Sequence, residues 1–205
     1  MITTTLKRIR DHKPCVEGWT KLLKHLGKAQ ADDDPLPFAT ILESNGLDDA
    51  LWCCRAEPQH AKEWRLYAVW CTRQVQHLMT DPRSLAALDV AGRHANGKAT
   101  ADELAAAWAV AGAAAWAAEW DAGDAAWAAA RDAARAAAWA AAWAAAWDAG
   151  DAAWAAARAA ARAAAWAAEW DAGDAAWAAQ AAEFLRVVTD DECYHASDEY
   201  MRECR

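Results

Sequence analysis

The chain has 205 residues, a formal net charge of -9, and 15 tryptophans against only 2 phenylalanines. The negative charge argues against a nucleic-acid backbone as the main partner, because phosphates attract basic surfaces. No signal-peptide pattern is present at the N-terminus, and the longest uncharged stretch, Leu104 to Ala118, is too short to cross a bilayer. We therefore expect a soluble, cytoplasmic protein.

Composition divides the chain into three predicted parts. Residues 1–99 have mixed apolar side chains and contain all 5 prolines, as expected of an ordinary helical module. Residues 100–189 consist mostly of alanine and tryptophan, with 5 arginines and 12 acidic residues, and form a predicted helical repeat region. Residues 190–205 carry 2 basic and 6 acidic residues and are expected to form an acidic polar tail.

Short helices are predicted throughout the N-terminal part, because apolar residues recur there at helical spacing between capping residues. Gly27 and Gly97 are expected to end the first and last of these helices. The second helix should start at the acidic residues 32–34, and Asp81 with Pro82 should end the fourth helix. The predicted segments are 15–27, 32–46, 46–58, 63–82 and 82–97. No segment alternates long enough to predict a sheet, so the fold class is all-α.

The string DAGDAAW occurs three times in the repeat region and is interpreted as a helix end followed by a helix start. The glycine supplies the left-handed residue after one helix, and the second aspartate caps the next. Because turns this tight join antiparallel helices, the pattern predicts an antiparallel array of about four Ala/Trp-rich helices. The first helix starts near Thr100, and the turns are Gly123-Asp124, Gly150-Asp151 and Gly173-Asp174.

Tryptophan and arginine recur every four residues within these helices and form one ridge on each. The ridges are Trp127, Arg131, Arg135, Trp139, Trp143 and Trp147, then Trp154, Arg158, Arg162, Trp166 and Trp170. Since alanine buries little area, the tryptophans are expected to supply most of the buried surface. A hairpin about Gly150 places every arginine at the height of a tryptophan. The pairs are Trp143 with Arg158, Trp139 with Arg162, Trp166 with Arg135, and Trp170 with Arg131; a turn at Gly123 also brings Trp116 opposite Arg131.

Three interpretations of the ridge stay open. The arginines can be spacers stacked on indoles, an arrangement worth about 0.5–2 kcal/mol per pair. The ridge can instead bind another protein. Finally, the guanidinium groups can bind phosphates while the indoles stack on a base. The candidate ligand-binding residues are Arg131, Arg135, Arg158, Arg162, Trp116, Trp139, Trp143, Trp166 and Trp170.

Other candidate chemistry is weak. Cys53, Cys54 and Cys71 are expected to be reduced and to pack as small hydrophobic residues. A Cys193, His195 and Cys204 set lacks a fourth zinc ligand, so no metal site is predicted. Neither a catalytic triad spacing, an HExxH motif nor a phosphate loop is present, so no cofactor is predicted and an enzyme ranks last.

One stretch resembles a known group of proteins. The segment SNGLDDALWCCRA and the following EWRLYAVWCTRQVQHLMTDPRSLAALDVAGRHANGKATADELAAAW resemble an N-terminal module of phage, prophage and bacterial proteins that continue into Ala/Trp-rich helical repeats. The motif HLMTDPRS and the repeats together carry the resemblance, which covers roughly residues 6 to 185. Some of these proteins resemble immunity proteins of polymorphic toxin systems. The resemblance implies a host-cell cytosol for a viral protein and brings no catalytic residues.

Two functional hypotheses follow. The first is a non-catalytic, phage-encoded counter-defence protein that sequesters an anionic, nucleotide-like signalling molecule in an Arg/Trp-lined cleft. The alternative is a protein-binding inhibitor or toxin immunity protein whose acidic surface attracts a basic partner. Self-association is also expected if the tryptophan ridge is exposed.

Overall fold

The computed structural model describes residues 1–79, 81–121, 155, 157–163 and 171–190, with the backbone alone described at 78, 112, 114–121 and 171–173. These ranges form helices and one small sheet, which confirms the all-α fold class. The α-helices are α1 (Leu6–Asp11), α2 (Val16–Leu26), α3 (Phe38–Asn45), α4 (Leu47–Cys53), α5 (Ala61–Gln74), α6 (Pro82–Ala95), α7 (Ala101–Asp121) and α10 (Asp171–Thr189). Three short 3-10 helices are η1 (Cys54–Ala56), η2 (Pro58–His60) and η3 (Gln76–Leu78), and the strands are β1 (Thr3–Thr4) and β2 (Leu36–Pro37).

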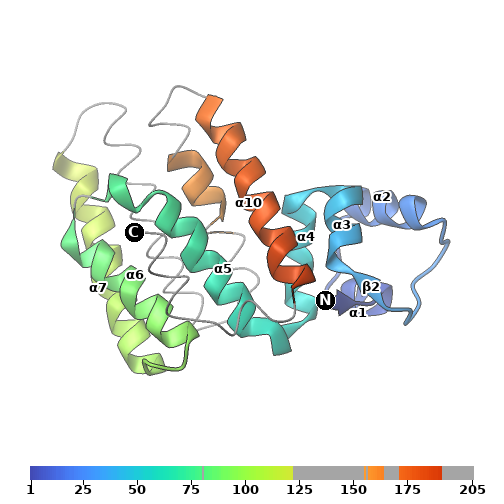
Figure 1. The fold of residues 1–205 in the computed structure, drawn as a ribbon, viewed down its shortest axis with the longest axis horizontal. Coiled ribbons are helices and arrows are strands. Elements are labelled where there is room, and N and C mark those ends of the chain that lie inside the picture. Colours follow the sequence, from blue (N-terminus) through green and yellow to red (C-terminus); the bar gives the residue numbers. More distant parts are fainter. Residues whose placement is uncertain (80, 122–154, 156, 164–170, 191–205) are drawn as a thin grey trace.

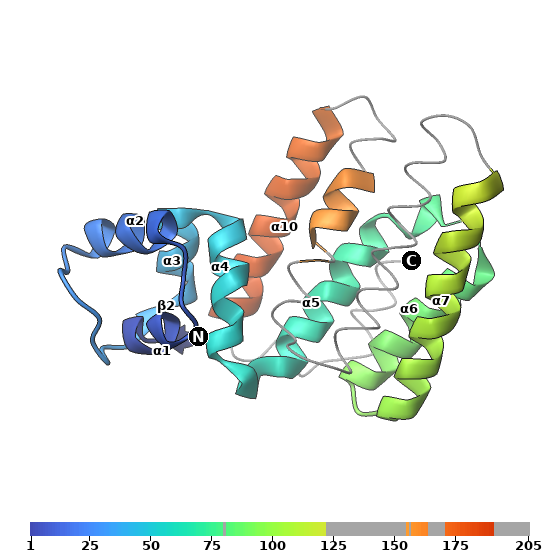
Figure 2. The same ribbon diagram turned by 180° about the vertical axis from the view of Figure 1, so that it is seen from behind.

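Helix α10 lies between two groups of helices (Figure 1). Helices α1 to α4 gather at one end, whereas α5, α6 and α7 lie side by side at the other (Figures 1 and 2). Helix α10 packs against both α3 and α5, although it is distant from them in sequence. Its last turn receives the N-terminus, because the N–H of Ile2 donates to the carbonyl of Val188 at 2.7 Å.

The small sheet was not predicted from the sequence. Strands β1 and β2 pair antiparallel, with Thr3 opposite Pro37 and Thr4 opposite Leu36. Each strand has only two residues, which is too short to show an alternating pattern. The pairing also overturns the predicted acidic start of the second helix, because Pro37 occupies the cap position of α3.

Aromatic side chains from α3, α5 and α10 form the centre of the core. Phe38 lies 5.4 Å from Trp64 between ring centroids, and Phe184 lies 6.0 Å from Trp64 and 5.5 Å from Tyr67. All four rings are fully buried. The Tyr67 hydroxyl donates to the carbonyl of Gln180 at 3.1 Å, which satisfies its polar end. Helix α10 is therefore part of the same core as the N-terminal helices.

The core crosses the boundary predicted between residues 99 and 100. One cluster of buried side chains contains the N-terminal aromatics together with Leu104, Ala160 and Val187. Buried residues from both sides of this predicted boundary therefore pack together.

Several helix ends follow the predicted capping residues. Gly27 ends α2 in the left-handed conformation, with φ of 64°, and Gly97 follows α6 with φ of 70°. Thr100 and Glu103 form a reciprocal capping box before α7, because each backbone N–H donates to the other's side chain, at 2.7 and 3.1 Å. The predicted start of this helix near Thr100 is therefore confirmed.

Other predicted boundaries are also wrong. Helix α5 ends at Gln74 rather than at Asp81, because the chain tightens into 3-10 turns that bury Val75 and Met79. Helix α10 begins at Asp171, so Gly173 is helical and Asp174 does not cap a new helix. A glycine costs about 1 kcal/mol in a helix interior, which α10 offsets through its buried Phe184, Val187 and Val188. The turns predicted at Gly123 and Gly150 lie outside the described residues.

Candidate functional site

Two of the predicted ligand-binding side chains lie in the described part of the chain. Arg158 and Arg162 both belong to the helical segment 157–163. Trp116 lies on α7, at a position where the backbone is described but the side chain is not. The remaining candidates, Arg131, Arg135, Trp139, Trp143, Trp166 and Trp170, lie outside the described residues.

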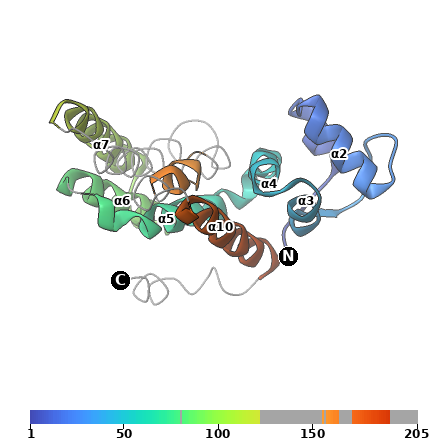
Figure 3. The same ribbon diagram turned by 90° about the horizontal axis from the view of Figure 1, so that it is seen from above.

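The segment 157–163 has an apolar side and a charged side. Ala157, Ala160 and Ala163 are buried in the main core cluster, whereas Arg158 and Arg162 are exposed. The two arginines are four residues apart, so their side chains lie on one face of the helix, about 5–6 Å apart at Cβ. Figure 3 shows this segment, in orange, beside α4 and α10. Alanine packing therefore fixes the helix, and its basic face points away from the core.

The first of these arginines meets an acidic residue of α4. Arg158 Nε lies 3.6 Å from Asp48 Oδ1, and the two side chains are 47% and 49% exposed. An exposed ion pair of this kind contributes about 0.2–1 kcal/mol. The contact orients the Arg158 guanidinium and places one carboxylate at the edge of the basic face.

At Trp108, the tryptophan of α7 whose side chain is described, the expected burial is not observed. Ala107 and Ala111 of α7 pack on Ala87 of α6, while Trp108 remains 47% exposed. Small side chains permit close approach of the two helices, which leaves the larger indole at the side of the contact. In the described first half of α7, the contact with α6 is therefore formed by alanines, as the core contact of segment 157–163 is.

The cysteines behave as the sequence predicted at three positions. Cys53, Cys54 and Cys71 are buried free thiols. Burial raises the pKa of the Cys53 thiol to about 12, with a smaller contribution from the Asp49 carboxylate, and burial also raises the pKa of Cys71. Cys15 differs, because it is exposed and its Sγ accepts a hydrogen bond from the N–H of Gly18 at 3.4 Å. Cys53 and Cys71 are therefore protonated near neutral pH and unreactive.

A pocket in the N-terminal module was not anticipated from the sequence. It has a volume of about 130 Å³ and opens between α1, α2, α3 and α4. Its walls include the indoles of Trp19 and Trp52, and Asn45, Asp49 and Cys15 supply polar groups. The available sequence signal was Gly18, a glycine inside a helical pattern, which often marks a close approach of another group. Its partners come from two other helices, so sequence spacing could not identify them.

Metal-ligand clusters and membrane-spanning helices are both absent from the described residues. No group of three or more metal-ligating side chains gathers in the described ranges. None of the helices described there combines the length and the apolar composition needed to cross a bilayer. Comparison of the chain with protein-family models, with curated proteins and with solved structures gave no match.

Proposed function

We propose that the protein is a non-catalytic binding protein that holds an anionic, nucleotide-like ligand on the basic face of segment 157–163. The observation that carries this proposal is the placement of Arg158 and Arg162 on one exposed face, one helical turn apart. Guanidinium groups suit phosphate, because their planar donors bind two oxygens at once.

The alanine side of the segment supports this role. Ala157 and Ala163 are fully buried, so the helix is held against the core and the arginine backbone positions are fixed before binding. A ligand then has only side-chain freedom to restrict, which reduces the cost of binding. Asp48 lies beside Arg158 and competes with an incoming phosphate for the same guanidinium.

The proposed biological setting is phage counter-defence by sequestration of a host nucleotide signal. The resemblance of the HLMTDPRS motif and the repeats to phage proteins supports this setting. Sequestration predicts that the ligand is recovered chemically unchanged after incubation with the protein. A converted ligand would instead indicate an enzyme.

The decisive experiment is calorimetry of the full chain with AMP, ATP and cyclic dinucleotides at low and physiological salt. We expect heat of binding for at least one of them, and loss of that heat in the Arg158→Ala/Arg162→Ala double variant. The matched control is Arg10→Ala/Arg93→Ala, which removes two exposed arginines from elsewhere and should retain binding. Absence of binding across the panel, or equal loss in both double variants, would refute the proposal.

A second variant separates the basic face from general charge effects. Asp48→Asn removes the competing carboxylate, so nucleotide affinity should rise by up to about fivefold, given that exposed ion pairs are worth about 0.2–1 kcal/mol. Glu43→Gln removes one negative charge on α3 and should leave the affinity nearly unchanged. Equal gains in the two variants would show that net charge alone controls binding.

The alternative is a protein-binding inhibitor or toxin immunity protein, which the net charge of -9 favours. An acidic surface speeds association with a basic partner, so the affinity for that partner should fall as salt rises. A stoichiometric basic protein recovered from host lysate, together with no nucleotide heat, would favour this alternative over the first proposal.

A further inference from the structure

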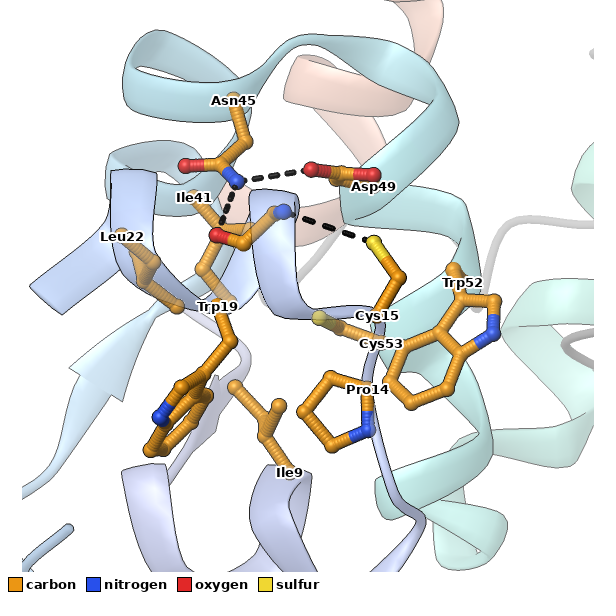
Figure 4. Close-up of a pocket in the computed structure, with 11 residues that line it drawn as sticks. Ile9, Pro14, Cys15, Trp19, Leu22, Ile41, Asn45, Asp49, Trp52 and Cys53 are labelled. Atoms are coloured by element: carbon orange, nitrogen blue, oxygen red, sulfur yellow. Dashed lines mark hydrogen bonds between the residues drawn. The ribbon is translucent and has the colours of Figure 1, made fainter.

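We propose that the pocket between α1, α2, α3 and α4 is a second binding site, which takes a small organic amine with an apolar body. The ammonium group would face the Asp49 carboxylate, and the apolar body would lie between the indoles of Trp19 and Trp52. Figure 4 shows these two indoles on opposite sides of the pocket and Asp49 near its upper edge. This site is separate in residues and opposite in charge from the arginine face on segment 157–163.

The size and walls of the pocket fit a compact apolar group. Its volume is about 130 Å³, and Ile9, Pro14, Leu22 and Ile41 complete walls that are mainly apolar. An apolar cavity of about 150 Å³ is large enough to hold benzene. The pocket therefore has room for one small ring or a short branched chain, but not for a nucleotide.

The carboxylate at its edge is fixed in place by two neighbours. The side-chain amide of Asn45 donates to Asp49 Oδ2 at 2.7 Å and to the carbonyl of Gly18 at 2.8 Å. A Cβ atom on residue 18 would lie only 2.7 Å from Asp49 Oδ2, so any larger residue there would displace the Asp49 carboxylate. Three helices thus hold one acceptor at the pocket, and such pre-orientation lowers the cost of binding a donor.

Asp49 also differs from its neighbour Asp48 in its partners. Asp48 forms an ion pair with Arg158. In the described part of the chain, Asp49 has a hydrogen bond from a neutral amide and no basic side chain within ion-pair distance. A partly buried carboxylate gains most from a cation, because the surrounding apolar walls weaken solvent screening. An amine fits this acceptor better than an alcohol, and a carboxylate ligand would be repelled.

The indoles further define how the amine lies. Arg55 occupies one face of Trp52, with its Cζ 4.4 Å from the ring centroid, and its Nε donates to the Trp52 carbonyl at 2.9 Å. This cation already occupies one face of the indole and disfavours a second cation on the same ring. The ligand's ammonium therefore belongs at Asp49, and its apolar part belongs against the indoles.

The test uses benzylamine as the probe, with benzyl alcohol and benzoate as neutral and anionic analogues of similar shape. Each is titrated into the isotopically labelled full chain, and the indole N–H signals of Trp19 and Trp52 are followed by NMR. We expect benzylamine to bind at least tenfold more tightly than benzyl alcohol, and benzoate not to bind. Equal affinity for amine and alcohol, or no shift of either indole signal, would overturn the proposal.

Variants then identify the carboxylate. Asp49→Asn should remove the preference for the amine over the alcohol, while Glu43→Gln, an equal loss of charge on α3, should keep it. Gly18→Ala keeps the Asp49 charge but displaces it, and should weaken amine binding at least threefold. Unchanged binding in both Asp49→Asn and Gly18→Ala would overturn the assignment, and a thermal melt of each variant confirms that it is folded.

An independent readout uses the exposed thiol that lines the same pocket. Alkylation of Cys15 by iodoacetamide, followed by peptide mapping, should slow at least threefold when benzylamine is saturating. Benzoate at the same concentration should have no effect. Equal alkylation rates with and without benzylamine would place the amine elsewhere and contradict the proposed site.

Discussion

The N-terminal helices and α7 bury their surfaces in different ways. Helix α5 buries large side chains, among them Trp64, Tyr67 and Val69, whereas α7 turns Leu104, Ala107 and Ala111 toward its neighbours and leaves Trp108 half exposed. A large buried side chain contributes about 1.5–3 kcal/mol, and an alanine contributes much less. Helix α5 is therefore stabilised mainly by packing, while the described first half of α7 depends more on helix propensity and its capping box.

The largest expected effect tests the packed part of this comparison. Phe184→Ala removes a fully buried ring that contacts Phe38, Trp64 and Tyr67. We expect it to lower the free energy of unfolding by about 3–5 kcal/mol, measured by urea denaturation. A loss below about 1 kcal/mol would show that α10 is not part of the central core.

The next effect concerns a buried carboxylate between α1 and the α4–α5 connection. Arg8 Nη1 lies 2.7 Å from Glu57 Oε2, and Glu57 is fully buried with Oε1 lacking a partner among the described residues. Arg8→Ala leaves this charge with the Gln59 amide only, so stability at neutral pH should fall by about 2–3 kcal/mol, somewhat less than for a wholly unpaired buried charge.

The matched control for Arg8 is an exposed ion pair of the neighbouring residue on α1. Lys7 contacts Asp33 at 3.0 Å, with side chains 61% and 67% exposed, so Lys7→Ala should lower stability far less than Arg8→Ala. Equal losses in the Arg8 and Lys7 variants would mean that burial of Glu57 adds nothing to the pair.

A smaller effect tests the dependence of α7 on its cap. Thr100→Ala removes the acceptor for the Glu103 N–H and should cost about 1 kcal/mol. The hydrogen bond from the Thr100 N–H holds the pKa of the Glu103 carboxyl below its ordinary value of 4.5. The ionised Glu103 carboxylate therefore contributes its full stabilisation of the folded state above pH 4.5. This stabilisation is lost as the pH falls through the lowered pKa that Glu103 has in the folded protein.

The measurement is urea denaturation at several pH values with helix content as the signal. Glu103→Gln keeps an acceptor but no charge, so its stability should vary less with pH than that of the parent between neutral pH and the acid range. A Glu103→Gln variant with the same acid dependence would contradict the capping argument.

The smallest expected effect concerns the exposed indole of α7. Trp108→Ala removes a side chain that is 47% exposed, so the free energy of unfolding should change by about 0.5 kcal/mol or less. A loss comparable to that of Phe184→Ala would show that tryptophan carries the packing of α7, and the contrast with α5 would then disappear.

Much of the fold follows from local sequence, but the site does so only in part. The helix ends at Gly27 and Gly97 and the helix start near Thr100 were readable because each depends on residues within one helical turn. The positions of Arg158 and Arg162 on one face followed from their spacing, although their pairing with tryptophans stays a prediction. The ion pair of Arg158 with Asp48 was not predicted, because these residues are distant in sequence.

The sequence alone determined that this protein is helical, where α2, α3 and α6 end, and that Arg158 and Arg162 share one helix face. Tertiary structure decided that β1 pairs with β2, that α10 returns to the N-terminus, and that Gly18, Asn45 and Asp49 meet at one pocket. Helix caps depend on neighbouring backbone groups, which the order of residues specifies. The pocket depends on contacts between separate helices, which form only when the buried core fixes their relative positions.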